Sequence, residues 1–181
     1  VYAVADDEEY EFFAVELSSF QLHWTYSLSP LASVVLNVAD DHVDWHGSFE
    51  AYKAAKARIY ENTQVACIFN EDHADTRRMV EEADVVEGAR AVSISTEIPR
   101  VSMLGLAEDI LVDRAFLKDR YHQALELGVL TDLAQAPGQV PAQHTVENAL
   151  AAAALTRAAG IAPEHVREGL RTYSPGAHRN Q

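Results

Sequence analysis

Apolar runs and stretches of helical periodicity alternate along this chain, and the alternation predicts an α/β fold. Short apolar runs bounded by polar residues are typical of buried strands, whereas apolar positions that repeat every three or four residues are typical of helices. Strands that alternate with helices favour a mostly parallel sheet flanked by helices, and a hairpin in the second half adds a smaller antiparallel portion. Residues 123–133 fit either a helix or an edge strand. The predicted strands are residues 12–17, 33–37, 64–70, 91–95, 101–106 and 110–116, and the predicted helices are residues 49–61, 72–83, 145–159 and 164–172.

Polar side chains gather in the loop between the strand predicted at 33–37 and the helix that begins after Ser48, a good N-cap residue. Ligands bind at the carboxyl ends of strands in open α/β sheets, so this loop is a candidate site. Ordinary solvent exposure is the alternative interpretation for single acidic residues such as Asp40 and Asp44. The potential metal or proton ligands of the loop are Asp40, Asp41, His42, Asp44 and His46.

Lys56 occupies an unusual place in the helix predicted at 49–61. It lies in the middle of the apolar side of that helix, whereas Arg58 and Glu61 are expected to point outward. A lysine in that position either extends its ammonium group to solvent or is held by a buried anion. Because the acidic loop comes directly before this helix, the loop and the lysine together indicate one site. The apolar residues on the side of Lys56 are Phe49, Tyr52, Ile59 and Tyr60.

A carboxylate interrupts the apolar run at 12–17. Glu16 lies near the carboxyl end of this predicted central strand, where a charged group is costly unless it is paired or bound to a cation. If the strand runs parallel to the one at 33–37, Glu16 reaches the same sheet edge as Asn37. In the turn that follows, Ser18 and Gln21 either face a ligand or make ordinary turn hydrogen bonds.

The helix predicted at 145–159 is the clearest in the sequence, because Gly160 follows it at the position that favours a helix end. We expect Asn148 in its first turn, beside free backbone N–H groups, where it either contacts a polar ligand or bonds within its own turn. The alanines of this helix allow close approach to a neighbouring element. For the helix at 72–83, Asp72 or Asn70 is the predicted cap.

Composition narrows the class of protein. The chain has 181 residues, 48% hydrophobic, which suits one globular domain rather than a disordered segment. A net charge of −14 argues against a nucleic-acid partner and against an anionic membrane surface. Cys67 is the single cysteine, so no disulfide forms within the chain, and we expect a reducing, cytoplasmic location. There is no signal peptide and no apolar stretch of about 18 residues, so we expect no membrane insertion.

Both ends of the sequence suggest a piece of a longer protein, because the first residue is valine and no finishing element follows His178. The sequence contains no glycine-rich phosphate loop. The candidate residues can bind a divalent cation and an anionic oxygen ligand, but nucleotide chemistry does not follow from them alone.

Four segments resemble the central ATP-binding domain of the Mur ligases. These are VELSSFQL at 15–22, VLNVADDHVDWHGSFEAYKAAKARIY at 35–60, HTVENALAAAAL at 144–155 and PGAHR at 175–179. Within the family, the segments resemble the members that add D-glutamate to UDP-N-acetylmuramoyl-L-alanine in peptidoglycan synthesis. The resemblance implies that residues 1–181 form a truncated central domain. It also implies that the N-terminal UDP-binding domain, the phosphate loop and the C-terminal domain lie outside these residues.

The resemblance also implies a metal site and a mechanism. Members of the family use ATP and Mg²⁺ to phosphorylate a substrate carboxylate, and an amine then attacks the acyl-phosphate. By resemblance, Glu16 holds one Mg²⁺ and His42 holds a second. Lys56 matches a lysine that becomes carbamylated, which converts a buried cation into an anion near Mg²⁺. His42 and Lys56 are therefore the candidate catalytic residues. We expect Lys56 to be unmodified in the isolated chain, because no bound cation supplies a counter-charge there.

Four further residues receive binding roles from the resemblance. Ser18 and Gln21 match positions near the muramoyl substrate, Asn148 matches an adenine contact, and Arg179 matches an arginine that approaches ATP. The family often has asparagine where this chain has Thr145, which is a departure at one nucleotide contact. We expect the isolated chain to bind ATP weakly or not at all, and to be inactive alone. The alternatives are a related amide ligase of the folylpolyglutamate synthase type and a binding module without chemistry.

Overall fold

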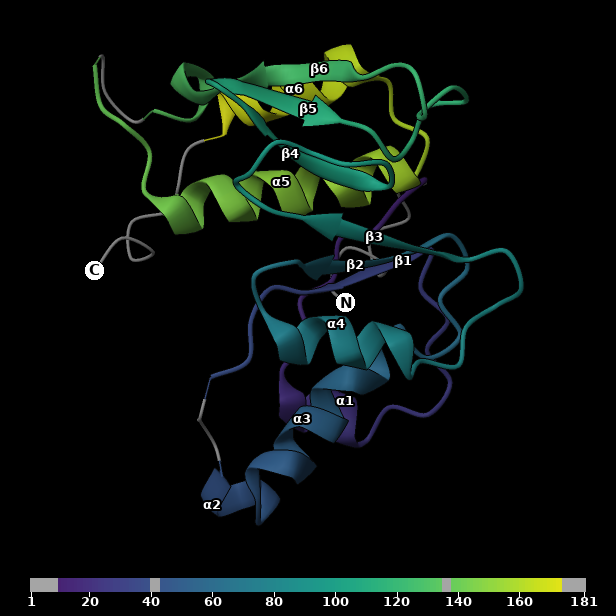
Figure 1. Ribbon diagram of the computed structural model, residues 1–181. Helices are drawn as coiled ribbons and strands as arrows, with labels where there is room; N and C mark the ends of the chain where they lie inside the picture. Colours follow the sequence, from purple (N-terminus) through teal and green to yellow (C-terminus); the bar gives the residue numbers. More distant parts are fainter. Residues whose placement is uncertain (1–9, 40–42, 135–137, 174–181) are drawn as a thin grey trace.

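A six-stranded mixed sheet runs through the computed structural model, which describes residues 10–39, 43–134 and 138–173 (Figure 1). The strands lie in the sheet in the order in which they occur in the chain. The pairs from β1 to β4 are parallel, and β4/β5 and β5/β6 are antiparallel, which confirms the predicted fold class. The strands are β1 (Ala32–Val35), β2 (Ala66–Asn70), β3 (Arg90–Ile94), β4 (Met103–Ala107), β5 (Ile110–Asp113) and β6 (Leu125–Val129).

Helices cover both faces of the sheet. In Figure 1, α3 and α4 lie below the parallel strands and α5 lies above them, while α6 packs on β6. Helix α3 lies between β1 and β2 in the chain, and helix α4 lies between β2 and β3. None of the described helices combines the length and the apolar composition needed to cross a bilayer. The helices are α1 (Ser19–His23), α2 (Val43–His46), α3 (Phe49–Ala57), η2 (Arg58–Tyr60), α4 (Ala74–Glu81), η3 (Leu130–Leu133), α5 (Gln143–Ala158) and α6 (Pro163–Thr172).

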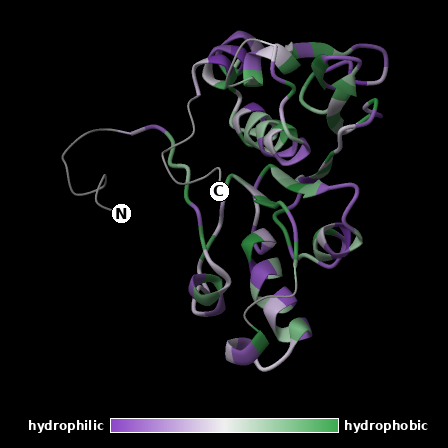
Figure 2. Cartoon of the chain, turned by 90° about the vertical axis from the view of Figure 1, so that its left-hand side faces the viewer, coloured by the Kyte–Doolittle hydropathy of each residue, from purple (hydrophilic) through white to green (hydrophobic). Residues whose placement is uncertain are grey.

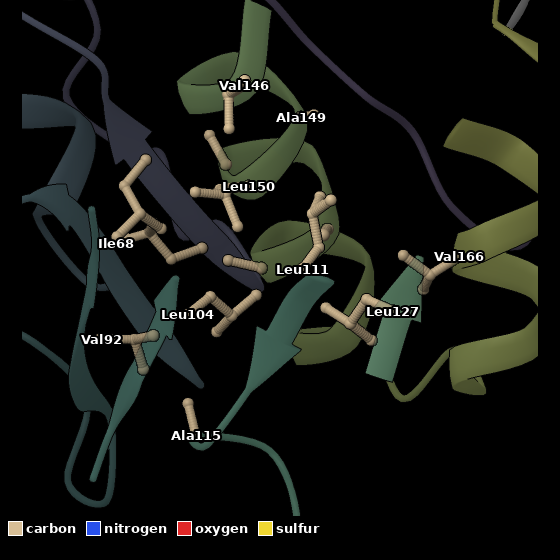
Figure 3. Packing of buried hydrophobic residues seen from close by; sticks show 14 of the residues in the cluster. Ile68, Val92, Leu104, Leu111, Ala115, Leu127, Val146, Ala149, Leu150 and Val166 are labelled. Carbon is tan, nitrogen blue, oxygen red and sulfur yellow. The ribbon is translucent and has the colours of Figure 1, made fainter. Parts of the chain in front are cut away.

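The main core lies between the sheet and helices α5 and α6 (Figure 3). Ile68 of β2, Leu104 of β4 and Leu150 of α5 are fully buried in it. Each such side chain contributes roughly 1.5–3 kcal/mol of transfer free energy. The buried alanines of α5 let the helix approach the strands closely, as the sequence predicts. These alanines are Ala149, Ala151, Ala153 and Ala154.

A short crossover joins the parallel strands β3 and β4, and a glycine permits it. The connection passes so close to Gly105 that a Cβ atom there would lie 2.3 Å from the carbonyl oxygen of Glu97. The same carbonyl accepts a hydrogen bond of 3.0 Å from the amide of Leu106. Any side chain at position 105 would therefore displace this connection from the edge of β4.

The strand predicted at 12–17 is not formed. Residues 12–18 have no regular secondary structure, and Phe13 and Val15 are exposed. Figure 2 shows this partly hydrophobic segment running along the outside of the fold. A continuous apolar run is stable as a central strand only when it has neighbours on both sides. None of the described strands pairs with this segment, so the apolar pattern alone does not make it a strand.

Three smaller sequence predictions are also corrected. Helix α4 begins after His73 without a side-chain cap, because the Asn70 side chain instead accepts a hydrogen bond from the amide of Asp72 in a local turn. Arg58 does not point outward: its guanidinium donates to the carbonyl oxygens of His23 and Thr25. Within the predicted polar loop, residues 43–46 form the short helix α2. Of the two alternatives for residues 123–133, the edge strand is confirmed: they hold β6, which η3 follows.

Candidate functional site

Helix α3 places Lys56 against the end of strand β1. The helix starts where the Ser48 side chain caps the amide of Ala51 at 3.1 Å, as predicted. Two turns later the Lys56 ammonium donates a hydrogen bond of 2.9 Å to the carbonyl oxygen of Asn37. The Tyr52 hydroxyl lies 3.5 Å from the same ammonium, and Tyr52 is buried. Lys56 thus contacts a backbone carbonyl just beyond the strand, an arrangement that neither of the two sequence-based interpretations includes.

Tyr60, one helical turn after Lys56, also hydrogen-bonds to strand β1. Its hydroxyl donates a hydrogen bond of 2.6 Å to the carbonyl oxygen of Ile68 and accepts one of 2.9 Å from the amide of Val35. The hydroxyl thus bridges the last residue of β1 and the middle of β2. Burial raises the pKa of Tyr60 above its ordinary value, so the hydroxyl keeps its proton at neutral pH. Lys56 and Tyr60 thus both hydrogen-bond to the backbone at the end of β1.

The two predicted substrate-binding residues contact each other at the start of α1. The Ser18 hydroxyl accepts a hydrogen bond from the amide of Gln21 at 3.3 Å, and the Gln21 side-chain oxygen accepts one from the amide of Ser18 at 2.8 Å. This reciprocal pair is a capping box. Both residues are exposed, so a ligand could reach them, but the contacts that the structure gives them are those of an ordinary helix start.

A histidine joins α1 to α2. The Nε2 atom of His46 lies 3.0 Å from the Ser19 hydroxyl, and its ring stacks on Phe20 with centroids 5.6 Å apart. Trp45 packs edge-on against both rings. Sequence reasoning placed His46 in the polar loop and missed this contact, because the pairing of α1 with α2 is a tertiary feature.

The remaining predicted site residues lie apart or outside the described part of the chain. Glu16 is exposed on the irregular segment before α1 rather than at a strand end. Asn148 is exposed, but it does not lie in the first turn as predicted, because α5 begins at Gln143. His42 and Arg179 lie outside the described residues, as do Asp40 and Asp41. The convergence of residues 16, 42 and 56 therefore stays a prediction.

The metal site also stays a prediction. Among the described residues, no three histidine, cysteine, aspartate or glutamate side chains gather as a ligand set, and this observation does not extend to residues 40–42. Asp44, which is described, is exposed in α2. Of the candidate site, the structure describes the contact of Lys56 at the carboxyl end of β1 and, separately, the Ser18–Gln21 pair at the start of α1.

Comparison with known proteins identifies the family. The Mur ligase middle domain matches residues 1–156. The UDP-N-acetylmuramoylalanine--D-glutamate ligases of Leifsonia xyli and Streptomyces avermitilis are 50% and 51% identical to this chain over 98% of its length. The chain spans only 35% and 37% of those two relatives.

A solved structure agrees on the fold. MurF from Acinetobacter baumannii superposes with a TM-score of 0.52 at 17% identity, over 83% of this chain and 31% of that one. At that identity the likeness concerns architecture alone. The extent of the domain match and the identity to the two ligases lead to one conclusion: the chain belongs to the Mur ligase family, through its middle domain.

Proposed function

We propose that this chain is the central, ATP-binding segment of a ligase that adds D-glutamate to UDP-N-acetylmuramoyl-L-alanine in peptidoglycan synthesis. The supporting observation is the identity of about half of its residues to ligases of that name across nearly the whole chain. The muramoyl ligase is therefore preferred over a folylpolyglutamate synthase. In this proposal the UDP-binding and C-terminal domains, and the phosphate loop, lie outside residues 1–181.

ATP and Mg²⁺ are the cofactors of this proposal. The residues present fit Mg²⁺ in type, because Glu16 is an exposed carboxylate just before α1 and carboxylate oxygens are the ligands that Mg²⁺ prefers. We assign Glu16, His42 and, when carbamylated, Lys56 to hold it. Bound Mg²⁺ neutralises phosphate charge during transfer. Asn148 and Arg179 are assigned to ATP.

The residues of this chain orient the reaction in three ways. Lys56 and Tyr60 hold the exit of β1, which leads into the loop that carries His42. Ser18 and Gln21 are assigned to the muramoyl substrate, and they bind it by exchanging one or more capping-box hydrogen bonds for bonds to the ligand. Carbamylation joins the neutral amine of Lys56 to CO₂ with release of a proton, so the ammonium that donates to Asn37 must first be deprotonated.

A chimeric enzyme tests the proposal. In the Leifsonia xyli ligase, the segment that matches this chain is replaced by residues 1–181, so that the flanking parts come from a relative of known name. We expect phosphate release that requires UDP-N-acetylmuramoyl-L-alanine, D-glutamate and ATP together. A folded chimera that releases no phosphate with these substrates contradicts the proposed function and favours a binding module.

Variants of the chimera test the site assignment separately. Glu16→Ala and Lys56→Ala should each reduce the rate by about 100-fold or more, the range found when one electrostatic group is removed from an active site. Lys53→Ala is the matched control, because Lys53 lies on the same helix and pairs with Glu50 and Asp75 at the surface. Full activity in the Glu16 and Lys56 variants would contradict the site assignment but not the family.

A further inference from the structure

The imidazole of His46 contacts three helices at once. His46 is the last residue of α2, a helix of four residues of which none is buried. Figure 1 shows α2 beyond α3, on the side away from the sheet. The Nε2 atom of His46 lies 3.0 Å from the Ser19 hydroxyl of α1, and its ring centroid lies 5.5 Å from that of Tyr52 in α3. One side chain of α2 therefore joins α1 to α3.

On the side of α1, His46 contacts the two residues that lie between Ser18 and Gln21. Ser19 supplies the hydroxyl, and Phe20 stacks on the imidazole with the two ring planes only 11° apart. Ser18 and Gln21 exchange the capping-box hydrogen bonds around these two residues. His46 thus holds the turn from Ser18 to Gln21 from within, while the two outer side chains of the turn are exposed.

On the side of α3, the contacts of His46 lead to Lys56. Tyr52 is buried, its ring faces His46, and its hydroxyl lies 3.5 Å from the Lys56 ammonium. The same ammonium lies 5.5 Å from the centre of the Tyr52 ring. The turn at the start of α1 and the Lys56 ammonium are therefore connected through two packed rings, those of His46 and Tyr52.

The pair of Ser19 and His46 has the residue types of a nucleophile and its base, but its burial gives it another role. A nucleophile must reach the atom that it attacks. Ser19 is only 6% exposed, whereas Ser18 on one side of it and Gln21 on the other are exposed. The hydrogen bond between Ser19 and His46 therefore acts on the substrate through the position of its neighbours.

We propose that His46 is a positioning residue, whose imidazole holds the turn from Ser18 to Gln21 at a fixed place relative to Lys56. The inference rests on the proposed function, which assigns this turn to the muramoyl substrate and Lys56 to the metal. A binding segment that is already ordered in its bound conformation loses less conformational entropy when the ligand binds. Without the bond between His46 and Ser19, the muramoyl substrate must order the turn itself, so its binding weakens.

The kinetics of His46→Phe in the Leifsonia xyli chimera test this role, because phenylalanine keeps a ring but removes the nitrogen that contacts Ser19. We expect the KM for UDP-N-acetylmuramoyl-L-alanine to rise about 3- to 10-fold, the range for loss of one intramolecular hydrogen bond. The KM for ATP should stay within about twofold. A merely structural defect would instead reduce the amount of folded enzyme, and with it the apparent kcat, and leave both KM values unchanged.

His23→Phe is the matched control. The ring of His23 packs against Trp45 in the same group of aromatic side chains, at a centroid distance of 5.2 Å. The hydrogen bond that Arg58 donates to His23 uses the backbone carbonyl, which the substitution keeps. Both KM values should therefore stay within about twofold of those of the unsubstituted chimera.

Ser19→Ala removes the other half of the same hydrogen bond. It should raise the KM for UDP-N-acetylmuramoyl-L-alanine by a similar factor to His46→Phe. The double variant should be no worse than the more affected single variant, because both substitutions remove one shared interaction. Increases that multiply in the double variant would show that the two side chains act separately, and would contradict the proposal.

The outcomes separate this inference from the proposed function. An active His46→Phe chimera with an unchanged KM for UDP-N-acetylmuramoyl-L-alanine, or with an equal rise in the KM for ATP, overturns the positioning role and leaves the proposed function intact. An unsubstituted chimera that folds but releases no phosphate overturns both. If His46→Phe does not fold, Ser19→Ala decides, and an unchanged KM in that variant overturns the positioning role.

Discussion

The Lys56 ammonium lies 2.9 Å from the carbonyl oxygen of Asn37, two residues beyond the end of β1. This contact connects helix α3 to the point where the chain leaves the sheet for the loop that carries His42. Independently of any modification or metal binding, Lys56 therefore helps to position the segment that follows β1. The contact also implies that Lys56 contributes to stability as well as to the proposed site.

Removal of this contact has a modest predicted cost. Lys56→Met keeps the aliphatic stem and removes the donor, so we expect a loss of about 1–2 kcal/mol in the free energy of unfolding, measured by urea denaturation. Lys53→Met, whose ion pairs involve exposed carboxylates, should lose less than about 1 kcal/mol. If the two variants are equally stable, the Lys56–Asn37 hydrogen bond is not a stabilising contact.

Tyr60 should matter more for stability than any other hydroxyl near the site. Tyr60→Phe keeps the ring but leaves the amide of Val35 and the carbonyl of Ile68 without their partner. We therefore expect a loss of about 2–4 kcal/mol, at roughly 1–3 kcal/mol for each buried group left unsatisfied. Tyr121→Phe, at an exposed tyrosine, is the control and should stay within about 0.5 kcal/mol of the wild type. A loss of less than 1 kcal/mol in Tyr60→Phe would contradict the bridging role.

The same hydroxyl predicts the behaviour at alkaline pH. Burial raises the pKa of Tyr60 in the folded chain, while the unfolded chain keeps the ordinary value of about 10. Its stabilising contribution is therefore fully present below about pH 10 and declines as pH rises above that value, because the unfolded state loses its proton first. The decline between pH 9 and 11 should be shallower in Tyr60→Phe than in the wild type. Parallel declines would show that other groups dominate this pH range.

A buried ion pair secures α5 to the sheet. Arg157 Nε lies 3.0 Å from Asp113, whose side chain is fully buried. Arg157→Met leaves that carboxylate without its cation, and we expect a loss of about 3–5 kcal/mol, measured by thermal or urea unfolding. The exposed pair of Arg167 and Glu126 gives the contrast, because Arg167→Met should cost less than about 1 kcal/mol. Similar losses in both variants would refute the distinction between buried and exposed pairs here.

Much of the fold is predictable from the sequence because short-range patterns determine it. The apolar runs that became β1, β2 and β3 are bounded by polar residues, and Gly160, with φ of 83°, ends α5 as expected. The apolar run at 12–17 has an equally clear pattern but no strand beside it. Strand formation depends on partners, which a pattern in one segment cannot reveal.

For the candidate site, the sequence indicated where Lys56 lies along the chain but not what it contacts. Lys56 does lie near the carboxyl end of β1, as the strand-end rule indicates. The partner of Lys56 is a backbone carbonyl, and every residue has one, so no side-chain pattern identifies it. Asn148 was misplaced because α5 starts earlier than Thr145, and helix boundaries depend on capping geometry.

Substrate-dependent phosphate release by the chimera of residues 1–181 in the Leifsonia xyli ligase tests the central claim most directly. The proposed function predicts release that requires UDP-N-acetylmuramoyl-L-alanine, D-glutamate and ATP and that falls by about 100-fold or more in Lys56→Ala but not in Lys53→Ala. A folded chimera with no release, or with release unchanged in Lys56→Ala, would contradict the account.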